Sequence, residues 1–299
     1  MAKIVCVGMA CLDYLFRVSI LPDGGGKFFA EDYRAAPGGP AAAAGIAAAA
    51  LGHEVVFIGR LGDDQVGRDL VRHLKKRSID ASHVRFIVGQ PSQVSSVTID
   101  HSGERQIINY SSSTLDPDPD WINESHFDNA DFLLTDVRWP EGAERALLLA
   151  RTLGIPSLID ADIAPIDISS LIDLATYTIF SERGLEMVSK KSNLEASLHQ
   201  ISKNYSTWPA VTSGDKGSFW LEKGLLQKCP AERIEAVDTC GAGDVFHGAF
   251  AVAMAEHRSL GEAMYFAGVV AALKCLTFGG SLGTPDRATV DRYIYKSGC

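Results

Sequence analysis

The sequence lacks any apolar run close to the roughly 20 residues that a helix needs to cross a bilayer. It also lacks a basic excess, because 28 Lys and Arg stand against 37 Asp and Glu and leave the 299-residue chain with a net charge of −9. That balance argues against nucleic acid or a membrane surface as a partner. The opening MAKIVCVGMACLDYL carries one lysine and then alternates as a strand does, unlike a secretory signal peptide.

Two common cysteine and phosphate motifs are also missing. No two of the six cysteines form a CxxC pair, and in a chain of this length scattered cysteines are typical of reduced thiols. We therefore expect a cytoplasmic protein. No GxxxxGK[ST] segment occurs, which excludes a P-loop kinase.

Short apolar strands alternate with helix-like segments along most of the chain. The predicted strands are KIVCVG, EVVFIGRLG, ADFLLTDVRW, PSLIDADI, YTIFSE and WPAVTSG. The predicted helices between them include GGPAAAAGIAAAALG, DDQVGRDLVRHLKKRS and EGAERALLLARTLG. This alternation predicts an α/β fold with a Rossmann-like, mostly parallel central sheet that helices cover on both faces.

Two stretches break that rhythm, CLDYLFRVSILPDGGGKFFAEDYRAA and QVSSVTIDHSGERQIINYSS. Each has the pattern of strand, turn and strand, and neither contains a helix. Two such hairpins most simply pair into a small inserted β-sheet, one face of which must close over a ligand or pair with another subunit. We interpret this sheet as a lid. The predicted α/β domain comprises residues 1–9, 36–90 and 113–299, and the predicted lid comprises residues 10–35 and 91–112.

The segment DTCGAGDVFHGAF, residues 238–250, places small residues and a carboxylate where an apolar helix begins. Gly241, Ala242 and Gly243 would let a phosphate approach the unpaired N–H groups of the first helical turn. Asp244 beside such a site has a use if it accepts the proton of a hydroxyl that attacks phosphorus. The alternative is an ordinary strand–helix turn with Asp244 as an N-terminal cap.

The same segment resembles the C-terminal signature DTxGAGDxFxGG of the ribokinase-like (PfkB) family of ATP-dependent sugar kinases. GGPAAAAGIAAAALG and GRLGDDQVG resemble its first signature, VTSGDKG its nucleotide-loop strand, and GMACLD its first substrate segment. These matches span nearly the whole chain in the order of the family. The resemblance implies a Rossmann-like kinase domain with an inserted β-sheet lid, which agrees with the pattern of strands and helices.

The resemblance also implies a role for each matching position. Asp244 would be the base, and Gly241, Ala242 and Gly243 would form the anion hole. ATP, with Mg²⁺, would be the phosphoryl donor, and no side chain is assigned as a metal ligand. The residues expected at ATP are Thr212, Gly214 and Gly217, with the segment 274–283, including Lys274 and Gly280, around the adenine. The residues expected at the sugar are Asp13 and Gly39.

Some positions depart from the common family pattern. Ala43 stands where ribokinases have a sugar-binding Asn, and SERG replaces the NxxE motif, which leaves Glu182 as the candidate to organise Mg²⁺. Cys240 replaces the usual Thr. At a helix N-terminus a thiol has a lowered pKa, which predicts an alkylatable cysteine that ATP protects. The alternative is a neutral substitution by a residue of similar size.

Within the family, GERQIINY and DVRW resemble the sulfofructose kinases, which implies phosphorylation of 6-deoxy-6-sulfofructose at its 1-hydroxyl. In that subgroup the residues corresponding to Lys27, Asn109 and Arg138 hold the sulfonate, an anion that suits a point charge, a neutral donor and a guanidinium fork. The alternative roles are a solvated lysine, a solvent-facing asparagine and an arginine in a surface ion pair.

Other functions remain open at this stage. Arg60 follows a strand and could bind a phosphate, which would favour another ketohexose or a sugar phosphate such as fructose 6-phosphate as the substrate. A non-catalytic sugar-binding regulator is a further alternative, although Asp244 and the anion-hole residues are intact. Because lid sheets of this family often pair, the resemblance also implies a homodimer through the lid.

Overall fold

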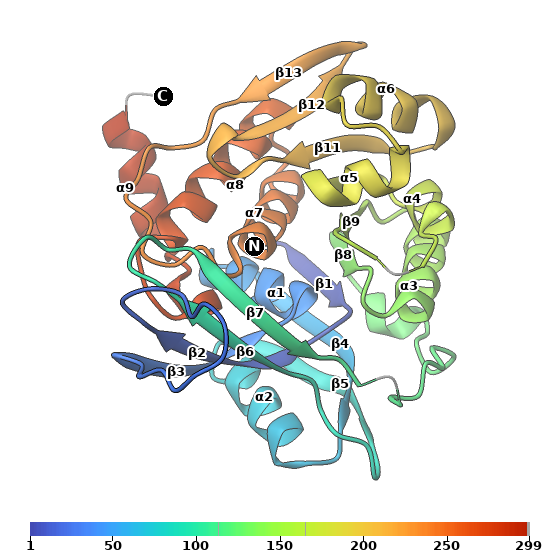
Figure 1. Ribbon diagram of the computed structural model, residues 1–299. Coiled ribbons are helices and arrows are strands. Elements are labelled where there is room, and N and C mark those ends of the chain that lie inside the picture. The colour runs from blue at the N-terminus through green and yellow to red at the C-terminus, as the bar shows by residue number, and fades with distance from the viewer. Residues whose placement is uncertain (113, 165, 298–299) are drawn as a thin grey trace.

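The computed structural model describes residues 1–112, 114–164 and 166–297. Within this part, nine strands form one central sheet, mostly parallel, with antiparallel β12 and β13 at one edge (Figure 1). In spatial order the strands are β13 (Leu225–Cys229), β12 (Ser218–Glu222), β11 (Trp208–Thr212), β10 (Tyr177–Ser181), β9 (Ser157–Ala161), β8 (Phe132–Asp136), β1 (Lys3–Val7), β4 (Glu54–Gly62) and β5 (Ile79–Ile87).

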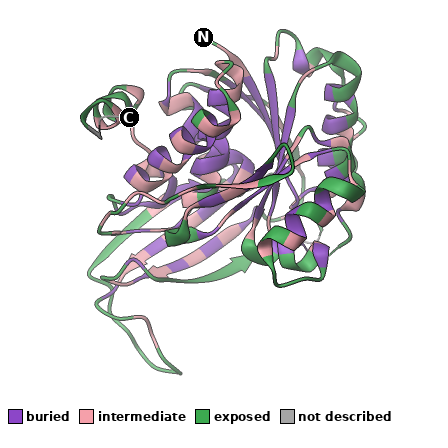
Figure 2. Ribbon diagram, turned by 90° about the horizontal axis from the view of Figure 1, so that it is seen from above, coloured by how far each residue is buried: buried purple, intermediate pink, exposed green. Residues whose placement is uncertain are grey.

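Helices cover both faces of this sheet, as the alternating pattern predicted (Figure 2). Along β1, Ile4 and Cys6 join the core on one face while Val5 and Val7 join the core on the other. The first face carries α1 (Pro40–Ala50), α2 (Gln65–Lys75), α7 (Ala242–Ala255), α8 (Leu260–Lys274) and α9 (Arg287–Ser297). The second face carries α3 (Pro140–Leu153), α4 (Ser169–Leu174), α5 (Glu182–Ser189) and α6 (Leu194–Asn204). No helix in the described ranges has both the length and the apolarity to span a membrane.

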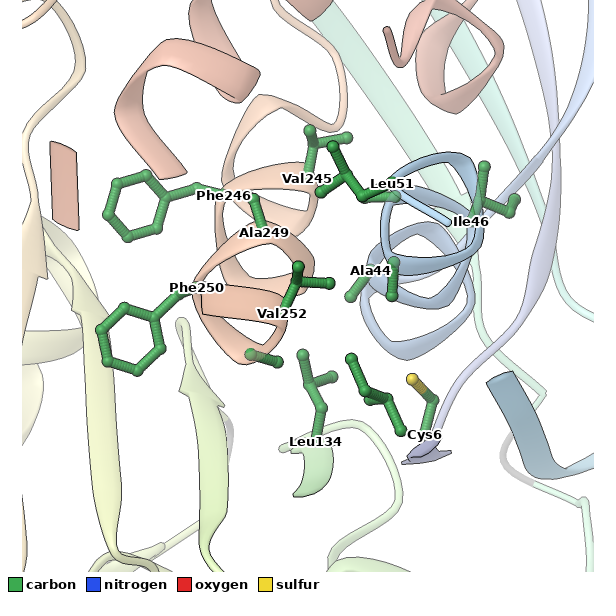
Figure 3. Packing of buried hydrophobic residues seen from close by; sticks show 14 of the residues in the cluster. Cys6, Ala44, Ile46, Leu51, Leu134, Val245, Phe246, Ala249, Phe250 and Val252 are labelled. Atoms are coloured by element: carbon green, nitrogen blue, oxygen red, sulfur yellow. The ribbon is translucent and has the colours of Figure 1, made fainter. Parts of the chain in front are cut away.

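The alanine-rich α1 packs against the sheet and also directly against α7 (Figure 3). A Cβ atom on Gly248 of α7 would lie only 2.2 Å from the carbonyl oxygen of Ala44, so the backbones of the two helices are in contact there. A Cβ atom on Gly45 would lie 3.3 Å from Val55 Cγ1 of β4. Small residues therefore bring α1 and α7 together and fix where their N-termini lie.

The lid is a separate sheet in which β3 (Asp32–Gly38), β2 (Cys11–Arg17), β6 (Val94–Ile99) and β7 (Arg105–Tyr110) lie in this spatial order. Each predicted hairpin is antiparallel, and β2 joins them by pairing in parallel with β6. The inner face packs Leu15, Val97 and Ile99 against Cys240 and Phe278 of the larger domain. The inserted lid sheet is thus confirmed, and the division into the stated residue ranges stays a prediction.

Candidate active site

The carboxyl ends of β1, β8 and β9 meet the N-termini of α1 and α7 at one edge of the central sheet. Ligands of open parallel sheets bind at this edge. Asp136, the last residue of β8, is buried there and accepts N–H groups of Met9 at 2.8 Å, Ala41 at 3.0 Å and Arg138 at 2.8 Å. It therefore ties the end of β1 to the first turn of α1.

Gly8, directly after β1, is required by this arrangement. A Cβ atom on Gly8 would lie 2.3 Å from Asp136 Oδ2. Gly39, the residue before α1, has φ +89°, and a Cβ atom there would lie 2.6 Å from the carbonyl oxygen of Met9. Close backbone packing thus explains Gly39 without a ligand, and its predicted contact with the sugar remains a prediction.

The turn before α7 leaves the helix N-terminus open. Gly241 has φ +76° and is the N-cap, and no side chain caps the helix. Asp244 therefore does not act as the N-terminal cap that the alternative interpretation proposed. A Cβ atom on Gly243 would meet nothing within 4 Å, so space remains beside the first turn. The N–H group of Ala242 donates to the carbonyl oxygen of Thr239 at 3.3 Å, whereas those of Gly243 and Asp244 have no acceptor four residues earlier, and the helix dipole favours an anion there.

Asp244, in the first turn of α7, lies among other carboxylates. Burial and the charges of Asp160, Asp13 and Asp136 raise its pKa, His247 opposes the rise, and the resulting pKa is about 7. Burial also raises the pKa of Asp13 on β2, whose Oδ1 lies 3.2 Å from the thiol of Cys11. The structure therefore brings Asp13 close enough to Asp244 for their charges to interact, and their predicted roles stay predictions.

The lid register places Asn109 on the same face as Asp13. Asp13 of β2 pairs with Ser95 of β6, and Ser95 pairs with Asn109 of β7. Register partners in neighbouring strands project from the same face of a sheet. The three residues therefore form a row across the lid, and its Asp13 end reaches the site of Asp244.

Arg138 and Lys27 have other partners in this structure. Arg138 donates through Nη2 to Asp162 Oδ2 at 2.7 Å and through Nη1 to the carbonyl oxygen of Ile163 at 2.8 Å. The ion pair that we gave as the alternative for Arg138 is therefore formed. Lys27 lies in the exposed loop between β2 and β3, with its Nζ 5.6 Å from the ring centroid of Phe29. No contact in the described residues joins Lys27, Asn109 and Arg138.

Arg60 is also engaged by its own chain. Its Nη1 donates to the carbonyl oxygens of Leu115 at 2.6 Å and Asp116 at 2.8 Å, and its guanidinium carbon lies 5.1 Å from the ring centroid of Trp139. These contacts anchor the segment that leaves the lid. The proposed phosphate-binding role of Arg60 thus has no support in this geometry.

A buried pair, Asp238 and Lys274, holds the signature loop to the segment after α8. The carboxylate of Asp238 accepts the N–H groups of Cys240 at 2.7 Å, Gly279 at 2.9 Å and Gly280 at 2.7 Å. Lys274 Nζ donates to the carbonyl oxygen of Asp238 at 2.8 Å and lies 3.4 Å from its Oδ1. The ammonium group of Lys274 is fully buried on Asp238 and is not free to contact ATP, and the predicted enclosure of the adenine by the segment 274–283 stays a prediction.

The predicted nucleotide residues lie at the end of β11 and in the 3-10 turn η2 (Gly214–Lys216). Gly214 has φ +51° and open space beside it, whereas a Cβ atom on Gly217 would lie 2.0 Å from the carbonyl oxygen of Cys229. Thr212, the last residue of β11, is partly exposed. Close packing against the chain therefore explains Gly217, and Gly214 and Thr212 remain open to a ligand.

Glu182 begins α5 beside this turn. Its carboxylate accepts hydrogen bonds from Ser213 Oγ and, at 3.2 Å, from Lys216 Nζ. The bond from Ser213 lowers the pKa of Glu182, burial opposes it, and Lys216 lowers it further. The described residues contain no group of three or more His, Cys, Asp and Glu side chains that could hold a metal ion.

The predicted reactive thiol at Cys240 is wrong. Burial, together with the charges of Asp13 and Asp238, raises the pKa of Cys240 to about 12. The side chain packs into the apolar contact between the lid and the larger domain, with Leu15 and Phe278. A thiol buried in this way is neutral, so the substitution resembles a small apolar residue more than a nucleophile.

The lid also touches the signature loop directly. Arg105 Nη1 donates to Thr239 Oγ1 at 2.7 Å, and that hydroxyl donates to the carbonyl oxygen of Gly103 at 2.8 Å. Thr239 lies two residues before Gly241, the N-cap of α7. The turn between β6 and β7 is therefore bonded to the loop that opens α7.

Several site residues were not predicted from the sequence, namely Asp136, Asp160, Asp238 and His247. Asp136 is the last residue of the apolar strand β8 and Asp160 the second-last residue of β9; we applied this signal to the cations Arg138 and Arg60 and not to these carboxylates. His247 Nδ1 lies 3.0 Å from Asp160 Oδ2. His247 stands at a variable position of the signature DTxGAGDxFxGG, so the signature predicted no role for it.

Comparisons with known proteins agree with this geometry. A family model described as pfkB family carbohydrate kinase matches residues 1–287. The ribokinases of Haemophilus influenzae and Bacillus subtilis are 27% and 26% identical to the chain, over 94% and 98% of it and 94% and 100% of their own lengths. Fructokinase-2 of Zea mays is 27% identical over 94% of the chain and 92% of its own length.

Solved structures share the fold. The crystal structure of a putative ribokinase from Agrobacterium tumefaciens superposes with a TM-score of 0.94 at 34% identity, covering 99% of this chain and 98% of the other. A structure of Arabidopsis thaliana ribokinase complexed with ribose and ATP superposes with a TM-score of 0.83 at 24% identity, covering 98% of each chain. The latter likeness supports the fold alone.

Proposed function

The chain belongs to the PfkB family of carbohydrate kinases, and on that basis we propose that it transfers the γ-phosphoryl group of ATP to the 1-hydroxyl of 6-deoxy-6-sulfofructose. The observation that carries the chemistry is Asp244 beside the uncapped N-terminus of α7. A carboxylate there can take the proton of the attacking hydroxyl while the N–H groups from Gly241 to Gly243 neutralise the charge that develops on the phosphoryl group. A pKa of about 7 suits a base that works near neutral pH.

The nucleotide would lie across the edge formed by Thr212, Gly214 and the segment around Gly280. Mg²⁺ would neutralise phosphate charge, and it keeps several waters and needs only one or two protein carboxylates. Glu182 fits a single, water-mediated carboxylate, because it is ionised and lies at the start of α5 beside the nucleotide turn. Lys216 already balances its charge, so Glu182 would orient waters and not hold the ion by itself.

The anionic end of the sugar is assigned to Lys27, Asn109 and Arg138. The lid row of Asp13, Ser95 and Asn109 supports Asn109, because it extends from the sugar side of the site. Lys27 lies on an exposed loop and would reach the sulfonate on closure of the lid. Arg138 would exchange or share its bond with Asp162.

A neutral ketohexose is the second candidate substrate. The ion pair between Arg138 and Asp162 favours it, because that guanidinium is already neutralised in this structure. The curated relatives named ribokinase and fructokinase point the same way. In either case the base and the anion hole are unchanged.

The test is kcat/KM with MgATP for sulfofructose, fructose 6-phosphate and fructose, measured side by side. We expect a large preference for sulfofructose. Arg138→Ala should then lower kcat/KM for sulfofructose roughly tenfold or more, through KM, and leave that for fructose nearly unchanged. Arg145→Ala is the matched control, because Arg145 of α3 donates through Nε to the backbone carbonyl oxygen of Ile122 and, among the described residues, has no ion pair with a carboxylate.

Other outcomes of this assay are equally informative. An equal loss for both sugars in Arg138→Ala makes Arg138 structural. A preference for fructose or fructose 6-phosphate overturns the sulfonate assignment and leaves the kinase mechanism in place. Turnover of ATP that no sugar stimulates would favour a sugar-binding regulator over a kinase.

The exposed outer face of the lid supports a homodimer. Tyr33 is 51% exposed, Ile108 70% and Tyr110 50%, and these side chains lie on β3 and β7. Exposed apolar faces on a small sheet mark an interaction surface. We assign that surface to the lid of a second copy of the chain.

A further inference from the structure

The buried imidazole of His247 takes no part in the mechanism above, although it lies one helical turn after Asp244 on α7. Residues three apart on a helix share a face. The His247 side chain is 4% exposed, and its Nδ1 lies 3.0 Å from Asp160 Oδ2, whose side chain is 6% exposed. Neither ring nitrogen has a partner of hydrogen-bond geometry in the described part of the chain, so the contact of Nδ1 with Asp160 is an ion pair.

The sheet register explains how Asp160 reaches α7. Asp160 of β9 is the register partner of Asp136 of β8, so both carboxylates project from the same face of the sheet. Leu134 and Leu158, two residues earlier on these strands, pack on that face with α7. Asp136 is held by backbone N–H groups, whereas among the described side-chain contacts Asp160 has His247 as its partner.

We propose that His247, held by Asp160, is a positioning residue of the phosphoryl transfer, whose imidazolium keeps the neighbouring Asp244 carboxylate ionised as the base. The proposal rests on the proposed role of Asp244. It assigns to the buried pair an electrostatic task and not only a structural link between β9 and α7. His247 itself would not touch the sugar or the nucleotide.

The charges around the pair support this assignment. The groups that act on Asp244 are Asp13 from β2, Asp136 from β8, Asp160 from β9 and His247 from its own helix, and of these His247 alone is basic. Burial lowers the pKa of His247, but Asp160, Asp244 and, from the loop after β9, Asp162 together raise it above its ordinary value. A protonated His247 is therefore the counter-charge in a cluster of carboxylates.

The first experiment compares the pH profiles of kcat/KM for wild type, His247→Gln and His53→Gln, using the best of the three sugars above. His53 is a matched control, because it is also buried and its Nε2 lies 3.1 Å from Glu256 at the other end of α7. The acidic limb of the profile is the fall of kcat/KM as Asp244 becomes protonated. In His247→Gln this limb should move to higher pH by about one unit. At pH values on the limb kcat/KM should then be about tenfold lower than in wild type, and at high pH it should equal that of wild type. His53→Gln should lower Tm and leave the limb in place.

A second readout does not depend on turnover. In protein labelled with ¹⁵N-histidine, the His247 ring should stay protonated at pH values above those of an ordinary histidine. Asp160→Asn should bring its titration down. A ring that is neutral at pH 7 in the wild type, or a limb that His247→Gln does not move, would overturn the proposal. An active Asp244→Asn variant would instead remove the proposed base, so the failures are distinguishable.

Discussion

Asp244 combines two properties that conflict in most proteins: it is a carboxylate, and it lies in a buried cluster of like charges. Burial together with Asp160, Asp13 and Asp136 raises its pKa to about 7, against an ordinary value of 3.8. At a pH between 3.8 and about 7, Asp244 is therefore protonated in the folded protein and ionised in the unfolded chain. Stability from this group is present at low pH and is lost as the pH rises through about 7.

The variant Asp244→Asn tests both the role of Asp244 in turnover and its effect on stability. Turnover should fall roughly 10²- to 10⁴-fold, because the base is removed, while the affinity for ATP measured by calorimetry stays nearly unchanged. Because the ionised carboxylate destabilises the fold, Tm of the variant should exceed that of wild type at pH 8, and the difference should shrink at pH 5.

The surface variant Asp120→Asn is the control for Asp244→Asn, since Asp120 is exposed. It should change neither quantity. Turnover of Asp244→Asn close to that of wild type would contradict the base assignment. A Tm difference that is the same at both pH values would contradict the charge argument and leave the base assignment untouched.

At the scale of elements, the close contact of α1 with α7 positions the site. The N-termini of these helices form the edge at which Asp136 and Asp244 meet, and Gly248 sets their separation. A shift of either helix would therefore move the anion hole relative to the end of β1.

Gly248→Ala tests this contact. Its methyl group would collide with Ala44, which should destabilise the fold by about 1–3 kcal/mol in urea unfolding and lower kcat. Gly268→Ala in α8 is the control, because a Cβ atom there meets nothing within 4 Å. It should stabilise the protein by about 0.5–1 kcal/mol and leave kcat unchanged. Equal effects of the two substitutions would show that the contact does not matter.

Local pattern predicted most of the elements, and its failures are also local. The apolar run EVVFIGRLG predicted a strand with the bounds Glu54–Gly62 that β4 has. Alternation of apolar and polar residues predicted the two hairpins of the lid. β5, β12 and β13 were not predicted. In β5 only Ile79 and Ala81 are buried, and β12 and β13 form a short hairpin at the edge of the sheet. Elements whose side chains are only partly buried carry a weak periodic signal.

The site shows a different limit. Asp244 and the glycines before it lie in one continuous segment and could be singled out from the sequence, whereas Asp160 and His247 are 87 residues apart and meet only where α7 packs on β9. Cys240 was judged from its place at a helix N-terminus, but its side chain turns into the lid contact. Lys274 was assigned to a ligand, and the buried Asp238 holds it instead.

At the scale of the whole molecule, the outer lid face predicts the oligomeric state. The chain of 32.1 kDa should sediment as a dimer in analytical ultracentrifugation. Ile108→Asp should shift it to a monomer, because it places a charge in the proposed apolar interface. Leu225→Asp, at an equally exposed position on β13, should leave the dimer intact. A monomeric wild type would contradict the interface.

The bond from Arg105 to Thr239 has a consequence for how ligands bind. The lid, which the proposed function places on the sugar, and the loop at the N-terminus of α7, which it places on the phosphates, are joined by hydrogen bonds through one hydroxyl. A ligand that orders the lid then also helps to order the loop before α7, and the reverse holds as well. By thermodynamic reciprocity, the factor by which sugar tightens ATP must equal the factor by which ATP tightens sugar. The order in which the substrates arrive would set the path to the ternary complex and leave its stability unchanged.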